Sequence, residues 1–254
     1  MINEELVNSH AYETAFWMAG VYSPDYPARL LGELATDVSN KIRAIAIFRL
    51  LSDGKSNSFY HNLIRSGLVR QRYLQRCRDE NLLSDHFRAS GRYLPLFDAI
   101  AAADFMLAAS IIDLSPTEYM PGHEYEDDHC YAQISHGLVT GRTERAQELL
   151  GRFERYLEGG RNGRFLVVAA LLEKDQQAFD LAFEQLLSDR EREIAADKKR
   201  RQIESPPILA FRRIFVEGLA ILRLAEKVRL RTEGEYLFCP SIARIPMTEP
   251  FPGE

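Results

Sequence analysis

The sequence predicts an all-α protein with a single core, and two patterns carry this prediction. Apolar residues recur at spacings of three and four, as in the stripe of Leu31, Leu34, Val38, Ile42 and Ile45, which is the period of a helix with one buried face. Strand-like alternation of apolar and polar residues is nearly absent. The chain has 254 residues, of which 46% are hydrophobic, and can therefore bury a substantial core.

Signals at the helix ends divide this periodic sequence into elements. Ser23-Pro24 places a capping hydroxyl before a proline at the first helical position. Ser115-Pro116 does the same, and Glu118 adds the carboxylate of a capping box to a short helix. We expect roughly eleven helices, near residues 3–19, 25–52, 56–79, 81–90, 93–103, 104–114, 125–140, 143–158, 163–174, 175–203 and 206–229.

Three consecutive segments share one plan, in which an apolar helix, a tight polar break and a second apolar helix follow each other. Tyr93, Tyr131 and Phe165 stand at their starts. The segments read LPLFDAIAAADFMLAASIIDL, YAQISHGLVTGRTERAQELLGRFERYL and FLVVAALLEKDQQAFDLAFEQLL. Their spacing is that of the tetratricopeptide size class, without its consensus residues. We therefore predict a degenerate tetratricopeptide-like helical-hairpin array, whose surface is free to bind a partner.

These elements are expected to form one domain over residues 1–245. It combines N-terminal helices in 1–90 with the helical-hairpin region in 91–230. Residues 246–254 form a proline-rich tail that cannot continue a helix and is expected either to lie along the surface or to be loose.

Composition and charge exclude several classes of protein. The formal net charge of -5 argues against direct binding of nucleic acid, which needs a strong basic excess. The longest apolar stretch, residues 94–112, is interrupted by Asp98 and Asp104, so we expect no membrane span. The N-terminus lacks the apolar run of a secretory signal. Together with an odd number of widely spaced cysteines, this predicts a cytoplasmic protein.

Each catalytic motif that the sequence suggests lacks a required residue, and we predict neither an enzyme nor a cofactor. Gly54-Lys55-Ser56 resembles the end of a phosphate-binding loop, but Arg49 stands where that loop needs its first glycine. Glu126 and His129 are three residues apart and could meet one metal ion from a helix. A helical di-iron site needs a second such pair, which we do not find, so we expect no metal.

The strongest surface feature is an acidic segment over residues 118–128. It contains five carboxylates and no lysine or arginine, namely Glu118, Glu124, Glu126, Asp127 and Asp128. A field of one sign speeds association with a basic partner and helps to select it, so these are the candidate partner-binding residues. The same run also fits an ordinary solvated face. Basic residues within 65–78 could form ion pairs with this acidic segment inside the chain.

Residues 93–240 resemble the immunity protein 49 family of bacterial polymorphic-toxin systems. The resemblance rests on four stretches, which read FDAIAAADFMLAASI, YAQISHGLVTGRTERAQELL, RFLVVAALLEKDQQAFDLAFEQLL and VEGLAILRLAEKVRLRTEGEYLFCP. It implies an all-α protein that binds a cognate toxin domain and neutralises it by occluding its active surface. An acidic surface would suit a basic toxin such as a nuclease.

Two other classes of function stay open. One is a helical-repeat adaptor that docks a peptide or protein. The other is a helical metalloenzyme built around Glu126 and His129.

Overall fold

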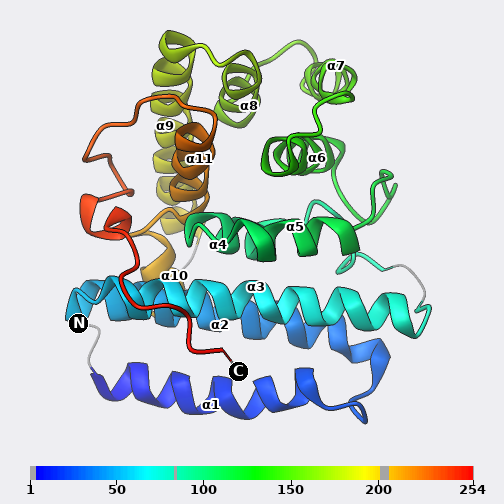
Figure 1. The fold of residues 1–254 in the computed structure, drawn as a ribbon, viewed down its shortest axis with the longest axis vertical. Helices are drawn as coiled ribbons and strands as arrows, with labels where there is room; N and C mark the ends of the chain where they lie inside the picture. Colours follow the sequence, from blue (N-terminus) through cyan, green and yellow to red (C-terminus); the bar gives the residue numbers. More distant parts are fainter. Residues whose placement is uncertain (1–3, 83–84, 201–205, 254) are drawn as a thin grey trace.

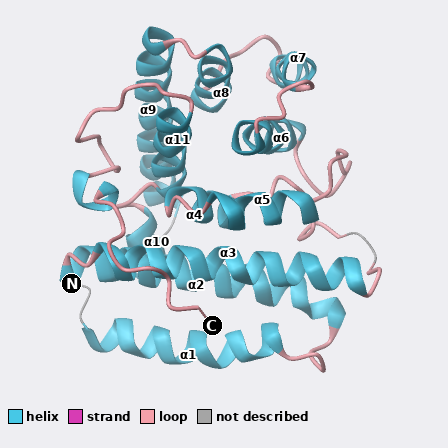
Figure 2. Ribbon diagram, viewed as in Figure 1, coloured by secondary structure: helices cyan, strands magenta, loops and turns pink. Residues whose placement is uncertain are grey.

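The computed structural model describes residues 4–82, 85–200 and 206–253, and over these residues it contains helices and loops but no strands (Figure 2). The prediction of an all-α fold is therefore confirmed. Most predicted helices are found within a few residues of their expected ends. The helix ends expected at residues 3 and 203 lie outside the described residues, as do residues 83–84 of the helix expected over 81–90.

The first layer of the fold consists of three long helices that lie side by side (Figure 1). They are α1 (Glu4–Tyr22), α2 (Ala28–Asp53) and α3 (Ser56–Asp79). The α2–α3 turn contains Gly54 at a φ of 64°, where its amide donates to the Leu50 carbonyl. Glycine adopts this left-handed conformation without steric penalty, which lets α3 turn back along α2.

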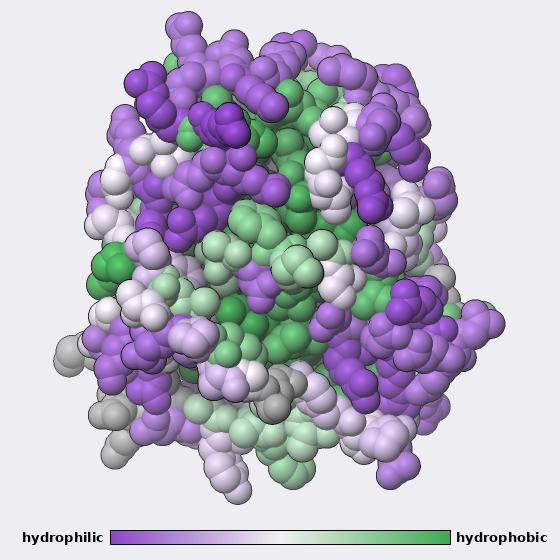
Figure 3. Space-filling view, viewed as in Figure 1, coloured by the Kyte–Doolittle hydropathy of each residue, from purple (hydrophilic) through white to green (hydrophobic). Residues whose placement is uncertain are grey.

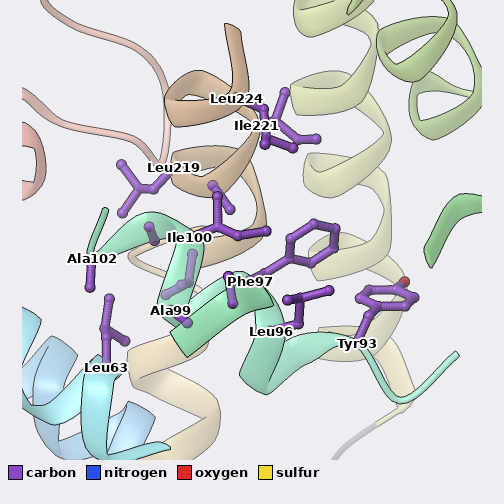
Figure 4. Close-up of a cluster of buried hydrophobic side chains, with 14 of the residues drawn as sticks. Leu63, Tyr93, Leu96, Phe97, Ala99, Ile100, Ala102, Leu219, Ile221 and Leu224 are labelled. Atoms are coloured by element: carbon purple, nitrogen blue, oxygen red, sulfur yellow. The ribbon is translucent and has the colours of Figure 1, made fainter. Parts of the chain in front are cut away.

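The second layer lies on α3 and contains the centre of the core. Helices α4 (Leu94–Ala101) and α5 (Phe105–Leu114) pack on α3, and α11 (Val216–Lys227) covers α4. In Figure 4 the side chains of Phe97 and Ile100 from α4 lie between Leu63 of α3 and the leucines of α11. This contact joins the N-terminal helices to the hairpin region, so one core serves both.

Two helical hairpins complete the upper part of the molecule (Figure 1). They are α6 (Glu126–Thr140) with α7 (Ala146–Tyr156), and α8 (Gly163–Glu173) with α9 (Gln176–Arg200). A Cβ atom on Gly163 would lie 2.4 Å from the Leu186 Cα atom, so only glycine allows α8 and α9 to come this close. These pairs agree with the predicted hairpin plan.

The chain ends on the surface of the first layer. After α10 (Pro206–Phe211) and α11, a short 3₁₀ helix, η1 (Ser241–Arg244), leads into the proline-rich tail. Thr248 exchanges hydrogen bonds with Asn57 of α3, and the ring of Phe251 lies against Arg65. The tail thus lies along the surface of α3.

In the view of Figure 3, hydrophobic residues show in the middle of the face and hydrophilic residues surround them.

One buried ion pair ties α2, α3 and α4 together. The Nε and Nη2 atoms of Arg43 donate to the two carboxylate oxygens of Asp98, both at 2.6 Å. The Ser66 hydroxyl also donates to Asp98, at 2.5 Å. Both charged side chains are almost fully buried. Such a pair needs these extra hydrogen bonds because desolvation of two charges is costly.

The helix predicted over residues 81–90 is wrong: its described part forms turns. Asp85 accepts from the amides of Phe87 and Arg88 and closes a tight turn. Arg70 of α3 donates to the carbonyl oxygens of residues 87, 88 and 89. These carbonyls are therefore used by an arginine from another helix instead of by a local helical ladder.

Three further predictions of helical boundaries are wrong. The helix expected over residues 206–229 is broken between α10 and α11, where the Phe215 amide donates to the Phe238 carbonyl 2.9 Å away. Ser115-Pro116 begins no helix, because residues 115–125 form an irregular loop. Ser23-Pro24 lies in the α1–α2 turn, and α2 begins only after Pro27. At the break between α10 and α11, this tertiary hydrogen bond outweighs the local helical propensity.

Candidate functional site

The acidic segment consists of the irregular α5–α6 loop and the first turn of α6. Glu126, Asp127 and Asp128 occupy that first turn. Carboxylates are favoured there because the helix N-terminus carries partial positive charge. The five predicted residues do not form one continuous exposed surface: some face the interior and some face solvent.

Glu124 faces the interior and holds the loop in place. Its side chain is only 3% exposed. Its carboxylate accepts from the backbone amide of Gly91 at 2.7 Å and from that of Met120 at 3.0 Å. The Ser90 hydroxyl donates to it at 3.1 Å. Burial raises the pKa of Glu124, but the hydrogen bonds from His129 and the two amides outweigh that effect and hold it below its usual value.

His129 lies under Glu124 in a fully buried position. Its Nδ1 atom is 2.9 Å from the Ser90 hydroxyl and 3.4 Å from a carboxylate oxygen of Glu124. In a nucleophilic triad the serine and the acid contact opposite ring nitrogens, whereas here both meet Nδ1. The Nε2 atom has no hydrogen-bond partner in the described structure. The arrangement connects two loops and does not form a proton relay.

Asp128 and Glu126 are paired with arginines from neighbouring helices. An oxygen of Asp128 lies 3.5 Å from Arg164 of α8 and accepts from the Tyr93 hydroxyl at 3.4 Å. Burial raises the pKa of Asp128, although Arg164 opposes the shift. Glu126 accepts from Arg152 of α7 at 2.9 Å. These pairs weaken the acidic field predicted from the sequence.

The outward part of the segment combines an acid with exposed tyrosines. Tyr125 is 69% exposed, and Tyr156, at the end of α7, is 42% exposed. Partial desolvation, together with the negative charge of Asp127, raises the pKa of Tyr156, so Asp127 lies within electrostatic range of the Tyr156 hydroxyl. Asp127 is partly exposed and forms no ion pair with the residues that the structure describes. We call Tyr125, Asp127 and Tyr156 the tyrosine–acid patch.

Glu118 lies apart from this patch. Its side chain is 81% exposed and its carboxylate is 3.7 Å from Arg145, which precedes α7. Tyr156 ends the same helix, about 16 Å away along an axis that rises about 1.5 Å per residue. Arg145 rather than the basic set on α3 pairs with Glu118. In that set, Arg76 donates to the backbone of the α1–α2 turn.

The structure does not bring Glu126 and His129 together as metal ligands. Glu126 is directed to Arg152, and the Nδ1 atom of His129 is directed to Ser90 and Glu124. Within residues 4–82, 85–200 and 206–253, no three histidine, cysteine, aspartate or glutamate side chains gather closely enough to hold a metal ion. The three cysteines are buried and unbonded to each other.

The exposed tyrosines were not among the predicted site residues. Tyr125 stands in the middle of the acidic run, and a large aromatic residue in a polar loop is a signal that sequence inspection can use. Tyr156 carries no such signal, because it belongs to the apolar stripe of a predicted helix. Only the packing of α7 beside α6 places it next to Asp127.

Comparison of the chain with protein-family models, with curated proteins and with solved structures finds no match. Of the helices in the described residues, none combines the length and the apolar character that a membrane crossing requires.

Proposed function

We propose that the chain is an immunity protein that binds a cognate toxin domain through the tyrosine–acid patch and occludes the active surface of that domain. The observation that carries the proposal is the pairing of exposed aromatic rings with the unpaired carboxylate of Asp127. Tyrosine is enriched at the energetic centres of interfaces. An unpaired acid beside it favours a basic partner. The resemblance of residues 93–240 to the immunity protein 49 family points in the same direction.

The patch is suited to this role because it is held rigidly. Tyr125 adjoins Glu124, whose carboxylate bonds to two backbone amides of other loop residues. Tyr156 lies on a helix that packs against α6. A surface that is already ordered loses little conformational entropy on binding. A toxin domain can therefore be captured without refolding of the segment.

Co-expression tests the proposal directly. The chain is produced together with the toxin-like domain encoded beside its gene, and growth and co-purification are scored. Rescue of growth together with a stable complex supports immunity. Unrelieved toxicity, or the absence of any such neighbour, contradicts it.

A matched pair of charge reversals then locates the interface. Asp127→Lys places a cation in the patch, and we expect it to weaken toxin binding about tenfold or more and to reduce the salt dependence of the affinity. Glu33→Lys is the control, since Glu33 is an exposed carboxylate of α2 outside the patch. Equal affinity of the two variants would exclude the patch as the interface.

A second candidate function, a helical adaptor, is favoured by a groove between α8 and α9. The groove has a volume of about 740 Å³, and its lining combines charged residues with apolar ones, among them Leu166, Ala169, Ala178 and Leu181. Small and apolar side chains of this kind accept an amphipathic helix. Ala169→Arg would fill the groove. Loss of partner binding in this variant, with normal binding by Asp127→Lys, would favour the adaptor over the immunity protein.

A further inference from the structure

A second concave site lies between the N-terminal layer and the hairpin region. It is a pocket of about 220 Å³, bounded by α2, α3, the loop over residues 91–95 and the start of α8. This volume is below that of most drug-sized sites and fits a small molecule. Its polar lining consists of Thr36, Ser39, Asn40, Arg70, Arg92 and Arg164. Three arginines and no carboxylate line it.

Arg70 is a buried charge that forms no direct ion pair with a described carboxylate, although Asp85 lies within electrostatic range of it. It is 6% exposed and satisfies its terminal nitrogens with three backbone carbonyls of residues 87–89. Buried charges in proteins are normally paired with an opposite charge. The carbonyl oxygens supply hydrogen bonds but no neutralising charge, and the Asp85 carboxylate that acts on Arg70 is itself bonded to the Tyr73 hydroxyl and the Phe87 amide. An anion in the adjoining pocket would supply a neutralising charge.

Arg92 is a second cation at the same pocket. It is exposed, and its Nε atom makes one long bond, 3.4 Å, to the His86 carbonyl. It forms no ion pair with a described residue. Burial and, to a smaller extent, the charge of Arg92 lower the pKa of Arg70 to about 10, so the two groups lie within electrostatic range of each other. Arg70 still stays protonated at neutral pH.

Arg164 differs, because its charge is already balanced. It donates to both oxygens of the buried Glu217, at 2.8 and 3.0 Å, and lies near Asp128. Arg70 and Arg92 are therefore the lining cations that form no ion pair with a described residue, whereas Arg164 shares its charge with two carboxylates. A phosphate monoester carries about −1.5 to −2 at pH 7 and accepts hydrogen bonds at three oxygens. It matches this pair in charge, and guanidinium groups match its geometry.

We propose that this pocket binds a small phosphate monoester, with the phosphate between Arg70 and Arg92 and the organic part beside Tyr93, Leu94 and Pro95. The neutral side chains of α2 complete the site. Asn40 accepts from Arg43 through its Oδ1 atom, which leaves its amide group to donate. Binding would stabilise the junction of the two layers because the ligand contacts both.

Calorimetric titration with glycerol 3-phosphate and with inorganic phosphate tests the proposal at constant ionic strength, with glycerol and chloride as blanks. We expect a dissociation constant below the millimolar range for glycerol 3-phosphate, and a rise in Tm on binding. Arg92→Gln should weaken binding about tenfold or more. The control is Arg72→Gln, since Arg72 is an exposed arginine of α3 that does not line the pocket, and it should bind as the original chain does.

A second variant distinguishes loss of phosphate binding from loss of folding. Asn40→Asp places a carboxylate at the pocket beside Arg43, which should preserve the fold and repel the phosphate. Absence of binding by the original chain at millimolar phosphate ester would overturn the proposal. So would binding that is unchanged in both Arg92→Gln and Asn40→Asp.

Discussion

The carboxylates of this protein occur in two settings, and the acidic segment contains both. Glu124 faces inward, where amide, hydroxyl and imidazole groups surround it. Two residues later, the chain enters α6, where Asp127 is partly exposed and Tyr125 and Tyr156 are exposed. The residues are chemically similar and close in sequence. The partners that each one meets decide whether it stabilises the fold or can attract another protein.

This difference corrects the interpretation of a run of charge as one surface. Of the five predicted residues, Glu124 is internal and Glu126 and Asp128 are paired with arginines. The field available to a partner is therefore produced mainly by Asp127 and, at the other end of α7, by Glu118. Substitutions that separate the inward carboxylates from the outward ones test this division.

The largest effect is expected at the most deeply buried carboxylate. Asp98→Ala removes the partner of Arg43 and leaves a cation with no counter-charge between three helices. Breaking a buried pair in this way costs about 3–5 kcal/mol. Urea denaturation followed by circular dichroism measures the loss. The double variant Arg43→Met with Asp98→Leu should recover much of it, and a double variant as unstable as the single one would contradict this account.

Glu124→Ala should be the next most damaging change. It leaves the amides of Gly91 and Met120 without an acceptor in a mostly buried place. Unsatisfied buried donors cost about 1–3 kcal/mol each, so we expect a loss of about 2–4 kcal/mol. Hydrogen exchange of these two amides provides a local readout. Amides that stay as protected as before would show that Glu124 does not hold the loop.

The lowered pKa of Glu124 predicts how its contribution depends on pH. A carboxylate whose pKa is lower in the folded than in the unfolded chain stabilises the fold above its unfolded pKa, about 4.3. That stability is lost as the pH falls through the folded pKa. The difference in unfolding free energy between the original chain and Glu124→Gln should thus be full at pH 7 and shrink below about pH 4. A difference that is constant with pH would contradict the assignment.

Helices of this protein are predictable where their apolar period matches their burial. The stripe from Leu31 to Ile45 is buried along α2 as expected. The region 81–90 failed because its carbonyls bond to Arg70, which lies earlier in the chain. The helix expected over residues 206–229 is interrupted before α11 for a similar reason, because the Phe215 amide bonds to Phe238. Local sequence cannot reveal a hydrogen-bond partner that only the tertiary fold supplies.

The candidate site was predictable in position but not in orientation. The sequence located a run of acids, whereas the inward turn of Glu124 depends on the amide of Gly91, more than thirty residues earlier in the chain. Likewise, Arg152 and Arg164 neutralise two of the acids from helices that follow in the sequence. Charge counted along the chain therefore overstated the field that a partner meets.

The smallest effect on stability is expected at the carboxylates that face solvent. Glu118→Lys and Asp127→Lys alter exposed or partly exposed groups, and the contact of Glu118 with Arg145 is a long surface pair of 3.7 Å. Such pairs contribute about 0–1 kcal/mol. Glu118→Lys should unfold within about 0.5 kcal/mol of the original chain, and Asp127→Lys within about 1–2 kcal/mol, because it also reverses a favourable charge at the N-terminus of α6, whereas Glu124→Lys should not fold normally. A large loss of stability in Asp127→Lys would mean that this carboxylate, too, maintains the fold, and any loss of toxin binding could then not be assigned to the patch.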